Sequence, residues 1–135
     1  MFYINLKENG YVTLISVLVI GAIGVAVGVS LISLGLSASR TSFSLEQSNQ
    51  TKALANACAE EALQQIRDQP LSFFGTDNLA LGRGNCTYTV TAGSGEDRTI
   101  EASGTVDTIV RKVEISIDQI NPTINITSWQ EVAEF

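Results

Sequence analysis

Residues 11–20 read YVTLISVLVI and belong to a long stretch without a charged side chain. The stretch covers residues 9–39 and is bracketed by Glu8 and Arg40. A helix needs about 20 apolar residues to cross a bilayer, so this stretch is long enough. Because lipid offers the backbone no hydrogen-bond partner, a single span is expected to be helical. The alternative is a helix buried inside a soluble protein.

Composition limits what the rest of the chain does. The 135 residues favour one domain, and 14 acidic against 8 basic residues give a net charge of −6, so a nucleic-acid partner is not expected. The chain has no histidine, which removes the usual general base and the commonest transition-metal ligand. Two cysteines are too few for a zinc site. We therefore expect no enzyme activity, no cofactor and no metal.

An amphipathic helix is predicted to follow the span over residues 40–67. Apolar side chains recur there at every fourth position, which is the spacing of one helix face; they are Leu54, Cys58, Ala62 and Ile66. The simplest interpretation is one helix from near Tyr11 to near Arg67. A break in the serine-rich residues 37–44 is the alternative.

A small sheet is predicted after this helix. Pro70 ends the helical region, and residues 68–85 are expected to form a loop because they are rich in glycine, Asp and Asn. Residues 86–135 contain about four alternating apolar and polar segments joined by short turns, which predicts an antiparallel sheet. One apolar face of the sheet would cover the helix. The predicted fold class is α+β, with a globular head over residues 40–135.

A short leader precedes the span, and it carries a family resemblance. Residues 7–15 read KENGYVTLI, and this order of charge, glycine, aromatic residue and charge-free helix resembles the class III signal of type IV pilins and type II secretion pseudopilins. The resemblance implies that residues 1–10 are removed by a prepilin peptidase, which cuts between Gly10 and Tyr11. It also implies N-methylation of Tyr11, assembly through residues 11–39 and a pilin-like fold.

The chain departs from the family pattern at one informative place. Most major pilins carry a glutamate at the fifth mature position, where this chain has Ile15, followed by Ser16. In the family, this glutamate pairs with the N-terminal amine of a neighbouring subunit. An ion pair suits lipid because an unpaired charge there is costly. The resemblance therefore implies a minor subunit. The span also lacks the proline that many pilins have.

Four glycines interrupt the span, and they are candidates for helix packing: Gly21, Gly24, Gly28 and Gly35. Small residues four apart let two helix backbones approach closely in lipid. Ordinary glycine enrichment of membrane helices explains them equally well.

The two cysteines are expected to form a disulfide. Cys58 lies on the predicted helix face, and Cys86 lies on the apolar face of the first predicted strand. A periplasmic or surface location would permit oxidation. Two buried free thiols are the alternative, since cysteine is a common core residue.

The expected function is that of a structural subunit of a type IV pilus or a secretion pseudopilus. Its expected partners are the prepilin peptidase, other pilin or pseudopilin subunits, the inner-membrane assembly platform and, before assembly, membrane lipid. The expected location is the cytoplasmic membrane before assembly and a periplasmic or surface filament afterwards. Two alternatives stay open: a ligand-binding head on an uncleaved signal anchor, and a secreted domain cut near Ser39.

Overall fold

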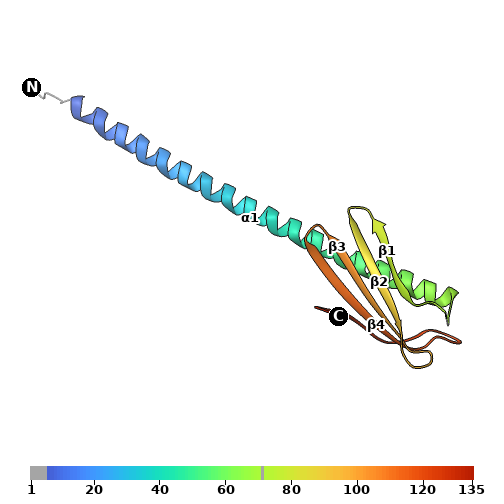
Figure 1. Ribbon diagram of the computed structural model, residues 1–135. Helices are drawn as coiled ribbons and strands as arrows, with labels where there is room; N and C mark the ends of the chain where they lie inside the picture. Colours follow the sequence, from blue (N-terminus) through green and yellow to red (C-terminus); the bar gives the residue numbers. More distant parts are fainter. Residues whose placement is uncertain (1–5, 71) are drawn as a thin grey trace, which may run out of the picture. The chain divides into compact units, whose positions relative to one another are not determined.

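The computed structural model describes residues 6–70 and 72–135, with the side chains of residues 6–9 excepted. Residues 1–5 of the expected leader therefore lie outside the described residues. The chain divides into two compact units between Phe43 and Ser44, and each is described by itself. The elements are α1 (Leu6–Asp68), β1 (Gly75–Leu81), β2 (Gly84–Ala92), β3 (Arg98–Val106), β4 (Ile109–Gln119) and β5 (Asn125–Val132) (Figure 1).

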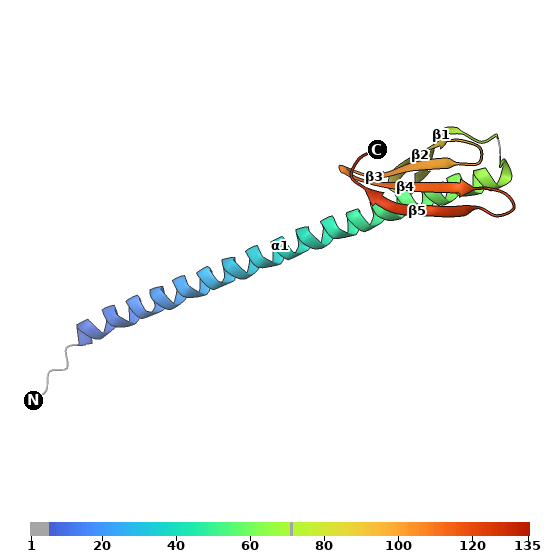
Figure 2. The same cartoon turned by 90° about the horizontal axis from the view of Figure 1, so that it is seen from below.

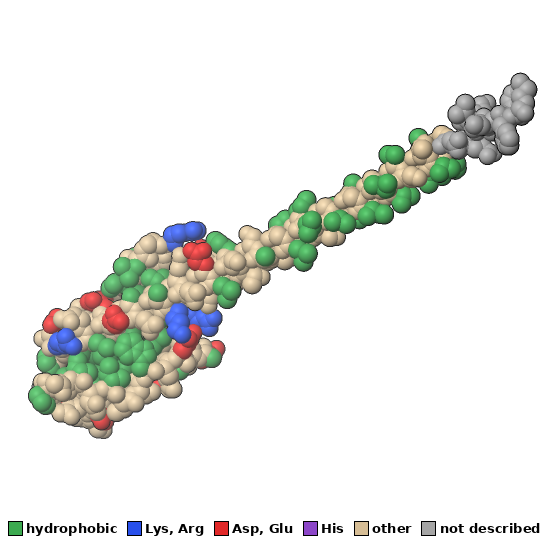
Figure 3. Space-filling view, turned by 180° about the vertical axis from the view of Figure 1, so that it is seen from behind, with side chains coloured by type: hydrophobic (Ala, Val, Ile, Leu, Met, Phe, Trp, Pro, Cys, Tyr) green, Lys and Arg blue, Asp and Glu red, His purple; other side chains and the backbone are tan. Residues whose placement is uncertain are grey.

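In the first unit, residues 6–43 are helical. Residues 37–44 belong to α1, so the alternative of a break in this serine-rich segment is wrong. The large apolar side chains of residues 11–36 are between 42% and 71% exposed, and they point to every side of the helix. Figure 3 shows them along the charge-free part of the helix. A helix that is apolar all round requires lipid or other helices around it.

The second unit, which we call the head, is the remaining part of α1 packed on one face of a sheet (Figure 2). The α+β fold class is therefore confirmed. The buried helix face follows the predicted i+4 spacing and consists of Ala55, Cys58, Ala59, Ala62 and Ile66. The sheet contributes alternate residues from three strands: Cys86, Tyr88, Val90, Ile100, Ala102, Val113, Ile115 and Ile117.

The sheet is an antiparallel meander in the order β1-β2-β3-β4-β5. Each strand pairs with its neighbour in the sequence, and the register places like faces together: Tyr88 lies opposite Ala102, which lies opposite Val113. The β-branched and aromatic residues of β2, β3 and β4 suit a pleated surface that is buried on one side. Two-residue turns join β1 to β2 and β3 to β4.

Strand β1 corrects one prediction. Residues 68–85 were expected to be a loop, but Gly75–Leu81 forms an edge strand paired with β2, so the sheet has five strands. Nearly all of β1 is exposed, and it therefore carries little of the alternation that reveals a half-buried strand. Asp77 and Asn78, which favour turns, are tolerated because the strand has a neighbour on one side only.

Glycine decides how closely the helix meets the sheet. A side chain at Gly104 in β3 would collide with the Thr51 carbonyl oxygen and would lie 2.7 Å from the Ala55 amide nitrogen. Both of those atoms belong to the α1 backbone. The helix backbone therefore rests directly on β3, and only a hydrogen atom fits between them.

The two ends of the head differ in what they bring together. The Ser44 end contains the β1–β2 turn, the β3–β4 turn and the C-terminal residues 131–135; these turns lie beside residues 47–54 of α1. The Pro70 end contains the β2–β3 turn and the β4–β5 connection, which lie beside the end of α1.

Candidate functional site

The predicted processing site lies at the start of the described side chains. Gly10 and Tyr11 are both helical and exposed, and the Thr13 hydroxyl donates a hydrogen bond of 3.0 Å to the Gly10 carbonyl oxygen. Lys7 and Glu8, which complete the motif, belong to α1, but their side chains lie outside the described residues. Cleavage between Gly10 and Tyr11 stays a prediction.

Five of the six serine and threonine hydroxyl groups in the span have partners within the helix. Each donates to a carbonyl oxygen three or four residues earlier, at 2.8–3.0 Å; the donors are Thr13, Ser16, Ser30, Ser33 and Ser37. These bonds give each hydroxyl proton an acceptor without water, as a helix in lipid requires. Within the described chain, α1 is the one helix that is long and apolar enough to cross a membrane.

The position where the pilin family has its glutamate is apolar and partly exposed. Ile15 is 42% exposed, and the neighbouring Ser16 hydroxyl donates to the Val12 carbonyl oxygen at 2.8 Å. Neither side chain offers a negative charge. An incoming amine would therefore find no carboxylate at this level of the helix.

The four glycines of the span share one side of the helix. At 3.6 residues per turn, they fall within an arc of about 60°; they are Gly21, Gly24, Gly28 and Gly35. A Cβ atom added at any of them would meet nothing within 4 Å. No contact with another described residue therefore requires glycine at these positions. The side chains of Val17, Leu18 and Val25 form the walls of a shallow groove at Gly21.

The disulfide is formed, as predicted. Cys58 of α1 and Cys86 of β2 are bonded, with their Cα atoms 6.0 Å apart, and both side chains are buried. Cys86 lies directly opposite Gly104 in the sheet register. The covalent link is therefore adjacent to the closest approach of helix and sheet.

A polar network holds the Ser44 end of the helix to strands β4 and β5. Lys52 and Arg111 both bind the Glu131 carboxylate, at 3.1 and 3.2 Å, and Arg111 also donates to the Ser48 hydroxyl at 2.7 Å. The hydrogen bond from Lys52, supported by the charges of Lys52 and Arg111, lowers the pKa of Glu131. Sequence reasoning missed this network because Ser48 and Lys52 lie more than 60 positions from their partners in β4 and β5, and no local pattern links residues so far apart.

Two further hydrogen bonds join α1 to the sheet near this network. Gln47 donates to Asp107 in the β3–β4 turn at 2.6 Å, and the Trp129 indole donates to Asn56 at 3.3 Å. Ser48, Lys52 and Asn56 recur every fourth residue, so they form one row along α1. The row fixes how far along the sheet the helix lies.

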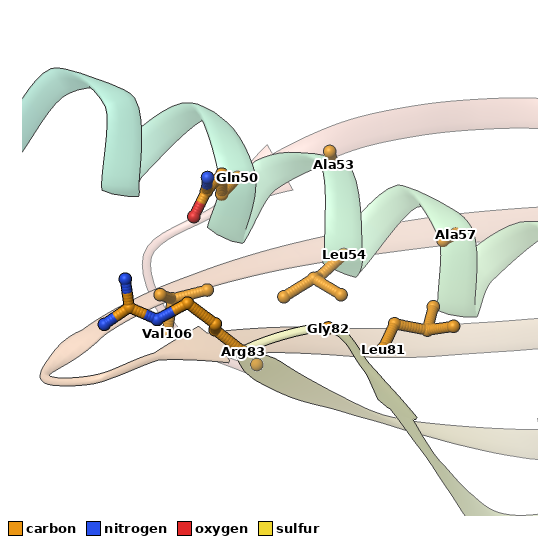
Figure 4. A pocket seen from close by; sticks show the side chains of 9 residues that line it. Gln50, Ala53, Leu54, Ala57, Leu81, Gly82, Arg83 and Val106 are labelled. Atoms are coloured by element: carbon orange, nitrogen blue, oxygen red, sulfur yellow. The ribbon is translucent and has the colours of Figure 1, made fainter.

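A groove of about 390 Å³ lies at the Ser44 end, between α1 and the β1–β2 turn. Figure 4 shows Leu54 and Leu81 pointing into it from opposite sides. Arg83 extends from the turn toward the mouth, below Gln50. The groove is therefore apolar inside and cationic at its rim.

A carboxylate organises the opposite end of the head. Glu96, in the β2–β3 turn, accepts hydrogen bonds from the backbone N–H groups of Ile120 and Asn121 at 2.9 and 3.2 Å. These bonds lower the pKa of Glu96. Arg98 is buried nearby, and its guanidinium donates to the carbonyl oxygens of Gly95 and Asp97.

Comparisons with protein-family models, with curated proteins and with solved structures found no match to this chain. The arrangement of its own side chains is thus what bears on function.

Metal-binding groups are not assembled in the part of the chain that the structure describes. No three His, Cys, Asp or Glu side chains there lie close enough together to hold an ion. The features that stand out are the exposed apolar helix with its glycine side and the covalently linked head that follows it.

Proposed function

We propose that this chain is a structural, minor subunit of a type IV pilus or of a type II secretion-like pseudopilus. The observation that carries the proposal is the helix of residues 10–43, whose apolar side chains are exposed on every side. Such a surface suits lipid first and other helices afterwards. The helix of a filament subunit contacts both environments, because the subunit lies in the membrane before assembly and then packs into the helical core of the filament.

The leader motif supports the same proposal. Gly10 followed by Tyr11 resembles the site at which the prepilin peptidase cuts and methylates. The subunit would then enter the filament by its helix, with the inner-membrane assembly platform and other pilin or pseudopilin subunits as partners. The absence of a carboxylate at Ile15 favours a minor role, because such a subunit cannot offer the family's partner for a neighbouring amine.

The glycine side of the helix has a use in this function. A Cβ atom added at Gly21, Gly24, Gly28 or Gly35 would meet none of the described residues within 4 Å. Another subunit's helix could approach there to a shorter distance than elsewhere on α1, because glycine leaves the backbone uncovered. The head, held by the Cys58–Cys86 disulfide, would remain outside the packed helices.

Mass spectrometry of the N-terminus, on protein from the native host, tests the proposal. We expect a chain that starts at a methylated Tyr11. A Gly10→Val variant should retain its leader, because the peptidase requires glycine before the cut. Gly21→Val is the matched control: it makes the same change in the same helix and should still be processed.

Two results would overturn the proposal. A start at Met1 in the mature protein would make α1 a simple signal anchor. A start near Arg40 would make the chain a secreted domain, and the head would then be the functional part.

A further inference from the structure

The Ser44 end of the head presents a cation with no partner. No hydrogen bond or ion pair joins the Arg83 side chain to another described residue. Its guanidinium lies at the mouth of the apolar groove formed with Leu54 and Leu81 (Figure 4). A ligand suited to this place has an anionic group next to an apolar chain.

Further basic and apolar side chains lie at the same end. Leu81, Val110 and Phe135 are 41%, 50% and 49% exposed. Lys112 lies over the Phe135 ring at 4.9 Å, and Arg111 lies beside Val110 in the sequence. Exposed apolar residues alternating with basic ones are typical of a surface that enters the headgroup layer of a membrane.

The Ser44 end also carries acidic side chains: Asp107 accepts a hydrogen bond from Gln47, Glu131 is paired with Lys52 and Arg111, and Glu134 lies near the end of the chain. The Pro70 end is the more acidic of the two. Its turns carry Glu96 and Asp97, and Asp118 lies near the end of β4. The one cation of the β2–β3 region, Arg98, is 4% exposed and bonded to carbonyl oxygens. Among the described residues no carboxylate pairs with Arg83 or Lys112, so these two cations of the Ser44 end would attract an anionic surface. The acidic side chains of the Pro70 end would be repelled by it.

Chain connectivity brings a bilayer to the attractive end. The charge-free stretch ends at Ser39, and the head begins at Ser44. Five residues span at most about 18 Å even when fully extended. The polar headgroup layer on each side of a bilayer is itself about 5–7 Å thick. The Ser44 end is therefore tethered close to that layer whenever the helix spans the membrane.

We propose that the Ser44 end of the head docks on the bilayer that holds its own helix, by binding an anionic phospholipid. The lipid phosphate pairs with Arg83, and the upper part of the lipid chain covers Leu81 and Leu54 in the groove. Lys112 adds attraction to neighbouring headgroups, whereas Arg111 is already paired with Glu131. The inference rests on membrane insertion, which is one part of the proposed function.

The test uses the full chain in nanodiscs made of phosphatidylcholine alone or with added phosphatidylglycerol, with one chain per disc. An added cysteine carries a fluorophore at Thr108, in the β3–β4 turn of the Ser44 end, or at Ser94, in the β2–β3 turn of the Pro70 end. Both positions are exposed, and the native cysteines are protected by their disulfide. Quenching by a spin label attached to the lipid headgroup reports contact with the membrane.

We expect the Thr108 label to be quenched in the anionic discs and the Ser94 label to remain unquenched. Arg83→Glu should lower the ratio of docked to undocked heads about fivefold or more, since one basic residue near an anionic surface contributes about that factor. Arg67→Glu is the matched control, because this exposed arginine lies at the Pro70 end. Leu81→Gln should weaken docking in both kinds of disc.

A label at Val25, within the span, separates the two possible failures. If the Val25 label is buried in lipid while the Thr108 label stays in water in both discs, the docking inference is wrong and membrane insertion stands. If the Val25 label is also in water, insertion fails, and with it the proposed function. Equal quenching of Thr108 in both discs, unaffected by Arg83→Glu, would overturn the role of an anionic lipid.

Discussion

Gly104 in β3 lies directly beneath the carbonyl oxygen of Thr51 in α1, with no room for a side chain between them. The contact joins two backbones, so neither partner can move aside by changing a rotamer. The distance between sheet and helix in the head is therefore fixed. The buried side chains of α1 include several alanines, which are small enough for this short distance.

Gly104→Ala should destabilise the head by about 1–3 kcal/mol or more, because the new methyl group forces the helix away from the sheet. Urea unfolding of the detergent-solubilised chain, followed by Trp129 fluorescence, measures the loss. Gly35→Ala is the matched control: its Cβ meets nothing within 4 Å, so head stability should not change. If Gly104→Ala unfolds at the same urea concentration as the native chain, the close approach of β3 to the α1 backbone would be contradicted.

Removing the disulfide should lower the free energy of unfolding by about 3–4 kcal/mol, because the bond closes a loop with a sequence separation of 28. The double variant Cys58→Ala/Cys86→Ala avoids leaving a free thiol. Reductant should shift the unfolding midpoint of the native chain toward that of the variant and leave the variant unaffected. If reductant does not change the unfolding midpoint of the native chain, the result would argue against the bond.

The Glu131 network should make a small contribution that depends on pH and salt. The folded-state pKa of Glu131 is lowered by Lys52 and then by Arg111. Its stabilisation is therefore present above the unfolded pKa of about 4.3 and is lost as pH falls through the folded pKa. Glu131→Gln should cost less than about 1 kcal/mol, since the pair is partly exposed. Stability measured at low and at high salt checks this, and the difference between variant and native chain should shrink at high salt.

Glu96 should hold the β4–β5 connection in its folded conformation. Its pKa is lowered chiefly by the backbone N–H groups of Ile120 and Asn121, so these bonds hold above the unfolded pKa and weaken as the carboxylate protonates in acid. Hydrogen exchange of those two amides should accelerate in Glu96→Gln. Asp97→Asn, next in the sequence, is the control. Equal exchange in the two variants would show that the hydrogen bonds to Glu96 do not protect the connection.

The glycine side of the span should matter for assembly and not for the fold. Gly28→Ile places a branched side chain where we propose that a neighbouring helix packs, and filament yield should fall about tenfold or more if each contact loses about 1.4 kcal/mol. Ala26→Ile makes a similar enlargement on the opposite side of α1. Electron microscopy of sheared filaments compares the two, and urea unfolding confirms that both heads are intact. Equal yields would remove the packing role of the glycines.

Periodic, half-buried segments could be predicted from the sequence. The helix face around Cys58 and the strand face around Cys86 follow regular spacings, and the disulfide pairing followed from them. Strand β1 was not predicted because nearly all of its residues are exposed, so apolar and polar residues do not alternate along it. Its Gly82–Arg83 turn to β2 was the local signal that could have revealed a hairpin.

The functional surfaces were predictable only in part. The leader motif and the span are continuous in the sequence, so Gly10, Tyr11 and the glycines could be named as candidates. The groove at Arg83 and the Glu131 network join residues far apart in the chain, and no local pattern reports such contacts. The groove and the network both depend on where the helix lies along the sheet, which only the three-dimensional structure shows.

The meander also sets the order in which the head can be built. Each strand pairs with the strand synthesised just before it, so no later segment must be threaded between earlier ones. Cys86 follows Cys58 by 28 residues, and β3, β4 and β5 come after both. Oxidation can therefore tie the first long hairpin to the helix while the remaining strands are still being added. A chain held by its N-terminal segment can thus complete its head one strand at a time, in the order of synthesis.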